Sequence, residues 1–101
     1  MLIATDKGWT EAVVDDSCRF DRFYQAAEIL EKNFDIKFSD QLDDFDSLYW
    51  DFNYKGSALV LHYHIYCGVS IFPKKFKLAT QEDNKTVIEI GTLLVKELDS
   101  E

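Results

Sequence analysis

The sequence predicts an α+β fold in which an antiparallel sheet of about three to five strands carries two amphipathic helices on one face. Between residues 34 and 72, large apolar residues often recur at every second position, which is the period of a strand. On both sides of this region, apolar residues recur every three or four positions, which is the period of a helix. Strands grouped between two helices favour an antiparallel sheet over alternating strand–helix units.

The clearest element is a β-hairpin formed by residues 47–54 and 57–67, joined by Lys55-Gly56. A two-residue loop at that point places Phe52 opposite Leu59 and Trp50 opposite Leu61. Turn and alternation then agree, because they put one apolar row on a single face of the sheet. That row consists of Leu48, Trp50, Phe52, Leu59, Leu61, Tyr63 and Ile65.

The N-terminal part is expected to form strands over residues 2–5 and 9–14, followed by a helix over residues 18–33. Asp15, Asp16 and Ser17 are the candidate caps of this helix, since their side chains can accept hydrogen bonds from its first N–H groups. The apolar stripe of the helix includes Phe20 and Phe23, spaced three residues apart.

After the helix, alternation predicts a short strand over residues 34–38 and an acidic connection over residues 39–46. A third antiparallel strand over residues 69–72 ends at Pro73, and residues 74–79 form a crossing loop. The second helix is expected over residues 83–98, capped by Thr80 with Asp83. Gly91 in the middle of this helix either permits a close approach of the helix to the sheet or is simply tolerated there.

A chain of 101 residues is expected to form a single domain spanning residues 1–101, and 47% hydrophobic residues suffice for a packed core. No apolar run is long enough to cross a membrane, and Asp6, Glu11 and Asp15 interrupt any signal peptide. The expected location is therefore cytoplasmic, without a membrane partner. Cys18 and Cys67 are expected to be buried thiols that act as small hydrophobic residues.

The face of the sheet opposite the apolar row displays the first candidate binding residues, which are Tyr49, His62, His64 and Tyr66. Val69 and Ile71 are expected to extend this face on the third strand. It is either a recognition surface or an ordinary half-solvated face on which aromatic side chains pair.

His62 and His64 are spaced to lie about 7 Å apart on one face, with Asp51 as the nearest third ligand. Surface or cross-strand histidines are the alternative, and the prediction is that neither a metal nor a cofactor is bound. No nucleophile has a base nearby, and no phosphate-binding or metalloprotease motif occurs. The chain is therefore expected not to be an enzyme.

The second candidate site is the acidic connection, in which four carboxylates surround Leu42 and Phe45. These are Asp40, Asp43, Asp44 and Asp46. Such a segment can dock in a basic cleft through complementary charge and apolar anchors. Its alternative is a solvated connection whose Leu42 and Phe45 fold into the core. A net charge of −8 argues against binding nucleic acid and favours a basic partner.

The C-terminal half of the chain resembles the hairpin region of small acidic immunity proteins of bacterial toxin–immunity systems, including those of contact-dependent growth inhibition. The residues that carry the resemblance are Tyr49-Trp50-Asp51-Phe52-Asn53-Tyr54-Lys55-Gly56, Leu59-Val60-Leu61-His62-Tyr63 and Gly68-Val69-Ser70-Ile71-Phe72-Pro73. The resemblance implies a cytoplasmic protein that neutralises a cognate toxin domain, such as a basic nuclease, by tight binding and occlusion. It assigns no functional residue.

Two other functions stay open on the sequence. One is an adaptor or regulatory domain that binds a peptide, or a second copy, through a sheet edge. The other is a metal- or small-ligand-binding protein that uses His62 and His64. The sequence leaves the oligomeric state undetermined.

Overall fold

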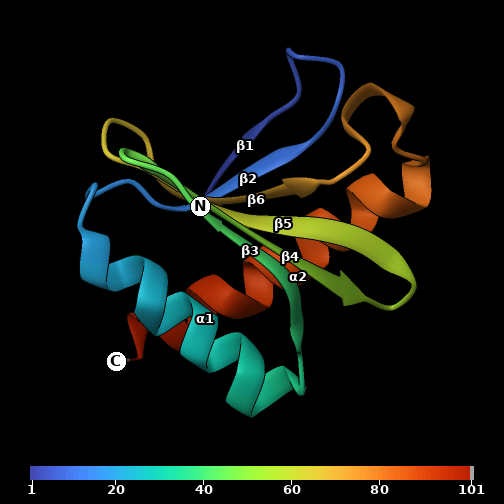
Figure 1. Ribbon diagram of the computed structural model, residues 1–101. Helices are drawn as coiled ribbons and strands as arrows, with labels where there is room; N and C mark the ends of the chain where they lie inside the picture. Colours follow the sequence, from blue (N-terminus) through green and yellow to red (C-terminus); the bar gives the residue numbers. More distant parts are fainter. Residues whose placement is uncertain (101) are drawn as a thin grey trace.

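The computed structural model describes residues 1–100 and shows a six-stranded antiparallel sheet packed against two helices (Figure 1). The strand order is β1-β2-β6-β5-β4-β3. The strands are β1 (Leu2–Ala4), β2 (Glu11–Asp15), β3 (Phe38–Asp43), β4 (Ser47–Tyr54), β5 (Ser57–His64) and β6 (Gly68–Pro73). The helices are α1 (Phe20–Phe34) and α2 (Gln81–Asp99), and a single 3-10 turn, η1 (Phe76–Leu78), precedes α2.

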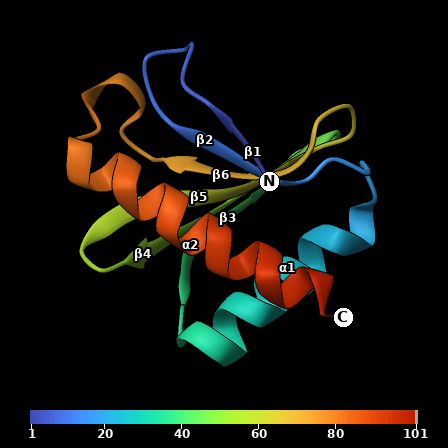
Figure 2. The ribbon, with the colours of Figure 1, turned by 180° about the vertical axis from the view of Figure 1, so that it is seen from behind.

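Both helices lie on the same face of the sheet (Figure 2). The predicted α+β class and the placement of the helices are confirmed, whereas the sheet has six strands rather than three to five. Most of the acidic segment predicted as a connection is a strand rather than a loop. Residues 38–43 pair with β4 as an edge strand, with a shift in register between Phe38 and Asp40.

The β4–β5 hairpin has the predicted register, with Trp50 opposite Leu61 and Phe52 opposite Leu59. Lys55 and Gly56 have φ values of +50° and +83°, as a tight turn matching the twist of the strands requires. The second strand ends earlier than predicted, at His64. Residues 65–67 form the turn to β6, so Ile65 is exposed instead of joining the core row.

The predicted strand over residues 34–38 is wrong, because its first residue ends α1. Asp35 adopts the left-handed conformation, with φ +54°, and the N–H of Ile36 donates to the carbonyl of Leu30 at 3.1 Å. This closure of the helix turns Ile36 into the core. The alternation of apolar residues here therefore spans a helix end rather than a strand.

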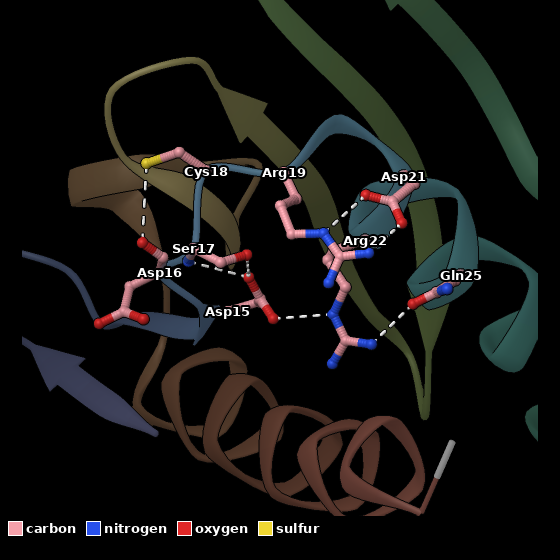
Figure 3. A network of polar contacts seen from close by, with 8 residues as sticks. All are labelled: Asp15, Asp16, Ser17, Cys18, Arg19, Asp21, Arg22 and Gln25. Carbon is pink, nitrogen blue, oxygen red and sulfur yellow. Dashed lines mark hydrogen bonds and ion pairs between the residues drawn. The ribbon is translucent and has the colours of Figure 1, made fainter.

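Helix α1 begins without a side-chain cap, so none of the three predicted cap residues acts as one. The carboxylate of Asp15 instead accepts a hydrogen bond from the Ser17 N–H and pairs with Arg22 in α1 at 2.9 Å (Figure 3). Burial raises the pKa of Asp15, but the hydrogen bonds from Ser17 and Arg22 outweigh burial and hold this pKa below its usual value. The network fixes the end of β2 to the first turns of α1.

Strand β6 lies between β2 and β5. The prediction that Val69 and Ile71 extend the face opposite the apolar row is wrong. Val69 pairs with Tyr63 and Ile71 with Leu61, so both side chains point to the core. Ser70 and Phe72 occupy the helix-free face instead.

Helix α2 begins as predicted with a capping box between Thr80 and Asp83. Gly91 permits a close approach, because a Cβ there would lie 3.0 Å from the Cβ of Ala12 in β2.

The core lies between the sheet and the helices, and its most deeply buried side chains come from both layers. They include Phe23, Leu30, Phe52, Leu59, Leu61, Ile71, Val87, Ile90 and Leu94. The predicted burial of the cysteines is wrong, since Cys18 is half-buried and Cys67 is exposed. Within residues 1–100, neither helix is long and apolar enough to cross a membrane.

Candidate protein-binding surface

Two turns meet at one end of the sheet, the turn between β3 and β4 and the turn between β5 and β6 (Figures 1 and 2). The N–H of Ile65 donates to the carbonyl of Asp46 at 3.2 Å, which joins the turns directly. We call the surface formed by residues 42–46 and 65–67 the acidic end. This surface contains three of the four predicted carboxylates, Asp43, Asp44 and Asp46, and lies next to the end of β5, the strand that carries His62 and His64.

Large apolar side chains protrude at the acidic end. Phe45 is 100% exposed, Tyr66 80% and Leu42 62%. Ile65 beside them is also exposed. The alternative in which Leu42 and Phe45 fold into the core is therefore wrong. Clustered exposed apolar side chains of this size often mark interaction sites.

Two of the predicted carboxylates hold the exposed turn in shape. Asp43 lies on the helix side, where its carboxylate accepts a hydrogen bond from the indole N–H of Trp50 at 2.9 Å. Asp44 accepts the N–H of Phe45 at 2.8 Å. These bonds orient the backbone that presents Phe45 to solvent.

The other two predicted carboxylates lie on either side of this turn. Asp40 is exposed in the edge strand, opposite Asp51 of β4. Asp46 lies 3.8 Å from the Nε2 atom of His64, so the two can pair when the imidazole is protonated. In the described part of the chain, Asp40, Asp43 and Asp44 form no ion pair within 4 Å, so their charges stay available to a partner.

The first group of candidate binding residues, Tyr49, His62, His64 and Tyr66, forms a row that leads from the helix-free face to the acidic end. The ring centroids of Tyr49 and His62 lie 4.6 Å apart, and those of His62 and His64 lie 6.4 Å apart. Tyr66 continues the row 5.6 Å from His64, although it lies in the turn rather than in the strand. Its N–H donates to the Nδ1 atom of His64 at 3.1 Å.

His62 lies in the middle of this row in an unusual environment. Its Nε2 atom is buried and has no hydrogen-bond partner within residues 1–100, while Nδ1 lies 3.4 Å from the hydroxyl of Ser70. Burial lowers the pKa of His62, and the neighbouring His64 lowers it further, against an opposing effect of Glu11. The lowered pKa leaves His62 mainly neutral at pH 7, and its ring packs against Phe72.

The structure does not assemble the metal site that the spacing of the histidines allows. Asp51, the predicted third ligand, forms an ion pair with Lys74 at 2.7 Å and lies opposite Val60 in the sheet. Across residues 1–100, no three side chains of His, Cys, Asp or Glu come together in a way that could hold a metal ion.

Sequence reasoning missed a cleft between the start of β1, the end of β2 and the end of α2. It has a volume of about 430 Å³, and acidic and apolar residues line it: Met1, Leu2, Val13, Val14, Asp15, Asp16, Val95 and Asp99. The residues come from the two termini and from β2, so no local pattern could have indicated the cleft. It places additional carboxylates at the same end of the sheet as the exposed turns.

Comparison with known proteins places the chain in a family without assigning it an activity. No curated protein and no solved structure matches it significantly. Residues 1–88, which include all six strands, α1 and the first turns of α2, match the family described as "Protein of unknown function (DUF3630)". Because the match covers most of the 101 residues, the chain belongs to this family.

Proposed function

We propose that the protein is a non-catalytic binding domain whose acidic end docks on a basic surface of a partner protein. The observation that carries the proposal is that Phe45 is fully exposed between carboxylates. Two of these, Asp43 and Asp44, have no ion-pair partner in the described chain. Exposing an aromatic side chain to water is unfavourable, and burial against a partner recovers about 25 cal/mol per Å² of apolar surface.

Charge and apolar anchors contribute differently to such binding. Complementary charge accelerates encounter and selects a basic partner, whereas buried aromatic anchors slow dissociation. Phe45 and Tyr66 can supply the anchors, and Asp40, Asp43 and Asp44 can supply the charge. The hydrogen bonds of Asp43 and Asp44 hold the turn before binding, which reduces the entropy lost on association.

The immunity role is the most specific form of this proposal, with a basic toxin domain as the partner that the protein occludes. The acidity of the chain and the exposed anchors support this form. A gene for a large secreted toxin immediately upstream would support it further, and a neighbourhood without one would favour a different basic partner.

Strand addition at the edge is the rival mode of binding. Strand β3 is an edge strand with one side free for main-chain pairing. Its acidic side chains and the shift in register near its start are features that oppose strand addition. The side-chain surface at the acidic end is therefore the better supported binding element, and β3 serves to carry it.

The test uses three tagged baits in affinity purification from the source cells at low and moderate salt. The wild type is compared with Phe45→Ser and with Asp43→Lys/Asp44→Lys. The partner recovered by the wild type is then purified, and its association and dissociation rates are measured at several salt concentrations. We expect Phe45→Ser to raise the dissociation rate at least tenfold, and the charge reversal to slow association and weaken its salt dependence.

Two matched controls separate the acidic end from general surface effects. Ile88→Ser removes another exposed apolar side chain, on α2 and away from the acidic end. Asp6→Lys/Glu31→Lys makes the same change in net charge elsewhere. Both controls should bind as the wild type does. Unchanged kinetics in the two acidic-end variants would contradict the proposal.

A further inference from the structure

Lysines and apolar side chains gather at the end of the sheet opposite the acidic end. The β1–β2 turn and the connection from β6 to α2 lie side by side there (Figures 1 and 2). The rings of Trp9 and Phe76 meet edge to face at 5.1 Å, and the side chain of Lys77 lies against Gly8. We call the surface formed by residues 7–9 and 74–78 the lysine end.

The lysine end combines exposed apolar groups with four lysines, of which two form no close ion pair. Leu78 is 83% exposed and Phe76 46%. Among the residues that the structure describes, Lys75 and Lys77 form no ion pair within 4 Å. Besides the hydrogen bond from the Thr80 N–H, however, Lys75 is near enough to Asp83 to help lower the pKa of that carboxyl. The other two lysines are paired, Lys7 with Glu11 and Lys74 with Asp51. The two ends thus present the same kind of apolar surface with opposite charge.

Phe76 is held firmly in place although its backbone is strained. Its φ of +52° lies in the left-handed region, which residues other than glycine rarely adopt. Its ring stacks on Phe72 with centroids 5.5 Å apart and also contacts Trp9. A side chain fixed in this way loses little conformational entropy when a partner covers it.

We infer that the lysine end of one molecule docks on the acidic end of a second copy, head to tail. This inference rests on the proposed function of the acidic end and names a partner for it. Lys75 and Lys77 would face the carboxylates of Asp43 and Asp44, and the exposed apolar side chains of the two ends would cover one another.

The net charge of −8 does not prevent this contact at moderate salt. Strands β4 and β5 have eight residues each and span about 26 Å between the two ends. The Debye length at 0.1 M salt is about 10 Å, so each end responds mainly to the charges nearest to it. Local complementarity then outweighs the repulsion between whole molecules.

The contact joins two different surfaces at opposite ends, so one contact leaves a free surface on each molecule. Repeating it produces open chains, or rings where the rotation closes, rather than a symmetric dimer. A basic partner that occupies the acidic end would stop the chain from growing. Self-association and partner binding are therefore expected to compete.

The experiment measures mass against protein concentration by analytical ultracentrifugation in about 0.1 M salt. The acidic-end variant is Asp44→Asn/Phe45→Ser, in which the new amide at position 44 retains a hydrogen-bond acceptor for the turn. The lysine-end variant is Lys75→Gln/Lys77→Gln/Leu78→Ser. These changes affect surface groups, and circular dichroism verifies that both variants fold.

We expect the average mass of the wild type to rise with concentration beyond that of a dimer. Each variant alone should stay monomeric, because it lacks one of the two surfaces. An equimolar mixture should form a heterodimer of twice the monomer mass and grow no further, since the intact ends pair once and the altered ends cap the complex.

A wild type that stays monomeric at every concentration would overturn the inference. A single variant that still self-associates, or a mixture that forms no heterodimer, would overturn it equally. The proposed function is judged separately, because the lysine-end variant retains the acidic end. If that variant binds the basic partner and the wild type is monomeric, only head-to-tail association is wrong.

Discussion

At the scale of single residues, Gly68 is the position where the fold depends most directly on the absence of a side chain. Its φ is +87°, and a Cβ there would lie 2.1 Å from the carbonyl oxygen of Asp15. That oxygen belongs to the backbone, so it cannot move aside as a flexible side chain can. The start of β6 therefore passes the end of β2 at a distance that only glycine allows.

We predict that Gly68→Ala destabilises the protein by more than the roughly 1–2 kcal/mol that a left-handed conformation costs an L-residue. Gly56→Ala is the matched control, because its φ is +83° but a Cβ there would meet nothing within 4 Å. Urea unfolding monitored by circular dichroism measures both changes. Equal losses in the two variants would show that the contact with Asp15 carries no cost.

His62 gives the protein a defined dependence on pH. Burial lowers its pKa below the ordinary value of 6.5, so the unfolded chain binds a proton before the folded one does. The contribution of His62 to stability is therefore fully present above about pH 6.5 and is lost as the pH drops through that value towards the lower pKa of the folded state.

We predict that His62→Phe flattens the fall in stability below about pH 6.5, since phenylalanine cannot take up the proton. Ser70→Ala, which removes only the group near Nδ1, should leave the slope in place. Urea midpoints across this range test the prediction. A slope in His62→Phe as steep as that of the wild type would assign the pH dependence to another group.

At the scale of the elements, the start of α2 depends on a reciprocal pair of hydrogen bonds. The Asp83 N–H donates to the hydroxyl of Thr80, and the Thr80 N–H donates to the carboxylate of Asp83, both at 3.0 Å. These bonds satisfy N–H groups that the first turn of a helix leaves without partners.

We expect Thr80→Ala to lower the free energy of unfolding by about 1 kcal/mol. Thr92→Ala, in the exposed middle of the same helix, should instead be neutral or slightly stabilising, because alanine has the higher helix propensity. Thermal and urea unfolding of the two variants give the comparison. A loss of the same size in both would argue that the cap is unimportant.

The elements that sequence reasoning predicted correctly are those that local signals determine. The hairpin register follows from alternation together with the Lys55-Gly56 turn, and the cap of α2 follows from Thr80 and Asp83. The sequence does not indicate strand β3, because Asp40 and Asp43 are poor strand formers. It is a strand because it pairs with β4, and the amino-acid composition of residues 38–43 alone does not predict this pairing.

The candidate surface was predictable only in part, for the same reason. The carboxylates and the histidines were identified as two separate groups, since nothing local shows that the β3–β4 and β5–β6 turns meet. The strand lengths bring them together, because β4 begins opposite the residue that ends β5. The exposure of Phe45 depends on its place at the tip of a turn rather than on its neighbours in the sequence.

At the scale of the whole molecule, the helix-free face is less open than the strand pattern suggests. Val60 and Phe72 point to that face and are nevertheless buried. Lys74 reaches Asp51 there, and Phe76 stacks on Phe72. Side chains of the sheet and of the β6–α2 connection thus close part of this face. Exposed apolar side chains lie at the two ends, and others lie at the N-terminus and on the helices.

The excess of acidic residues also acts on the molecule as a whole. With 19 acids and 11 bases, the folded protein carries a net charge of −8, and folding brings these charges closer together. Self-repulsion of this kind destabilises a compact state, and salt screens it. Exposed ion pairs weaken at the same time, but each is worth little.

We therefore predict that raising sodium chloride from about 0.02 to 0.2 M increases the Tm by about 2–5 °C, which corresponds to roughly 1 kcal/mol or less for a domain of this size. Asp16→Asn/Asp40→Asn/Asp44→Asn leaves 16 acids against 11 bases, a net charge of −5. This variant should melt at a higher temperature than the wild type in about 0.02 M salt and gain less from added salt, because less repulsion remains to be screened. Circular dichroism at the lowest usable protein concentration keeps self-association from contributing to the Tm. A variant that gains as much as the wild type would show that salt acts on something other than the net charge.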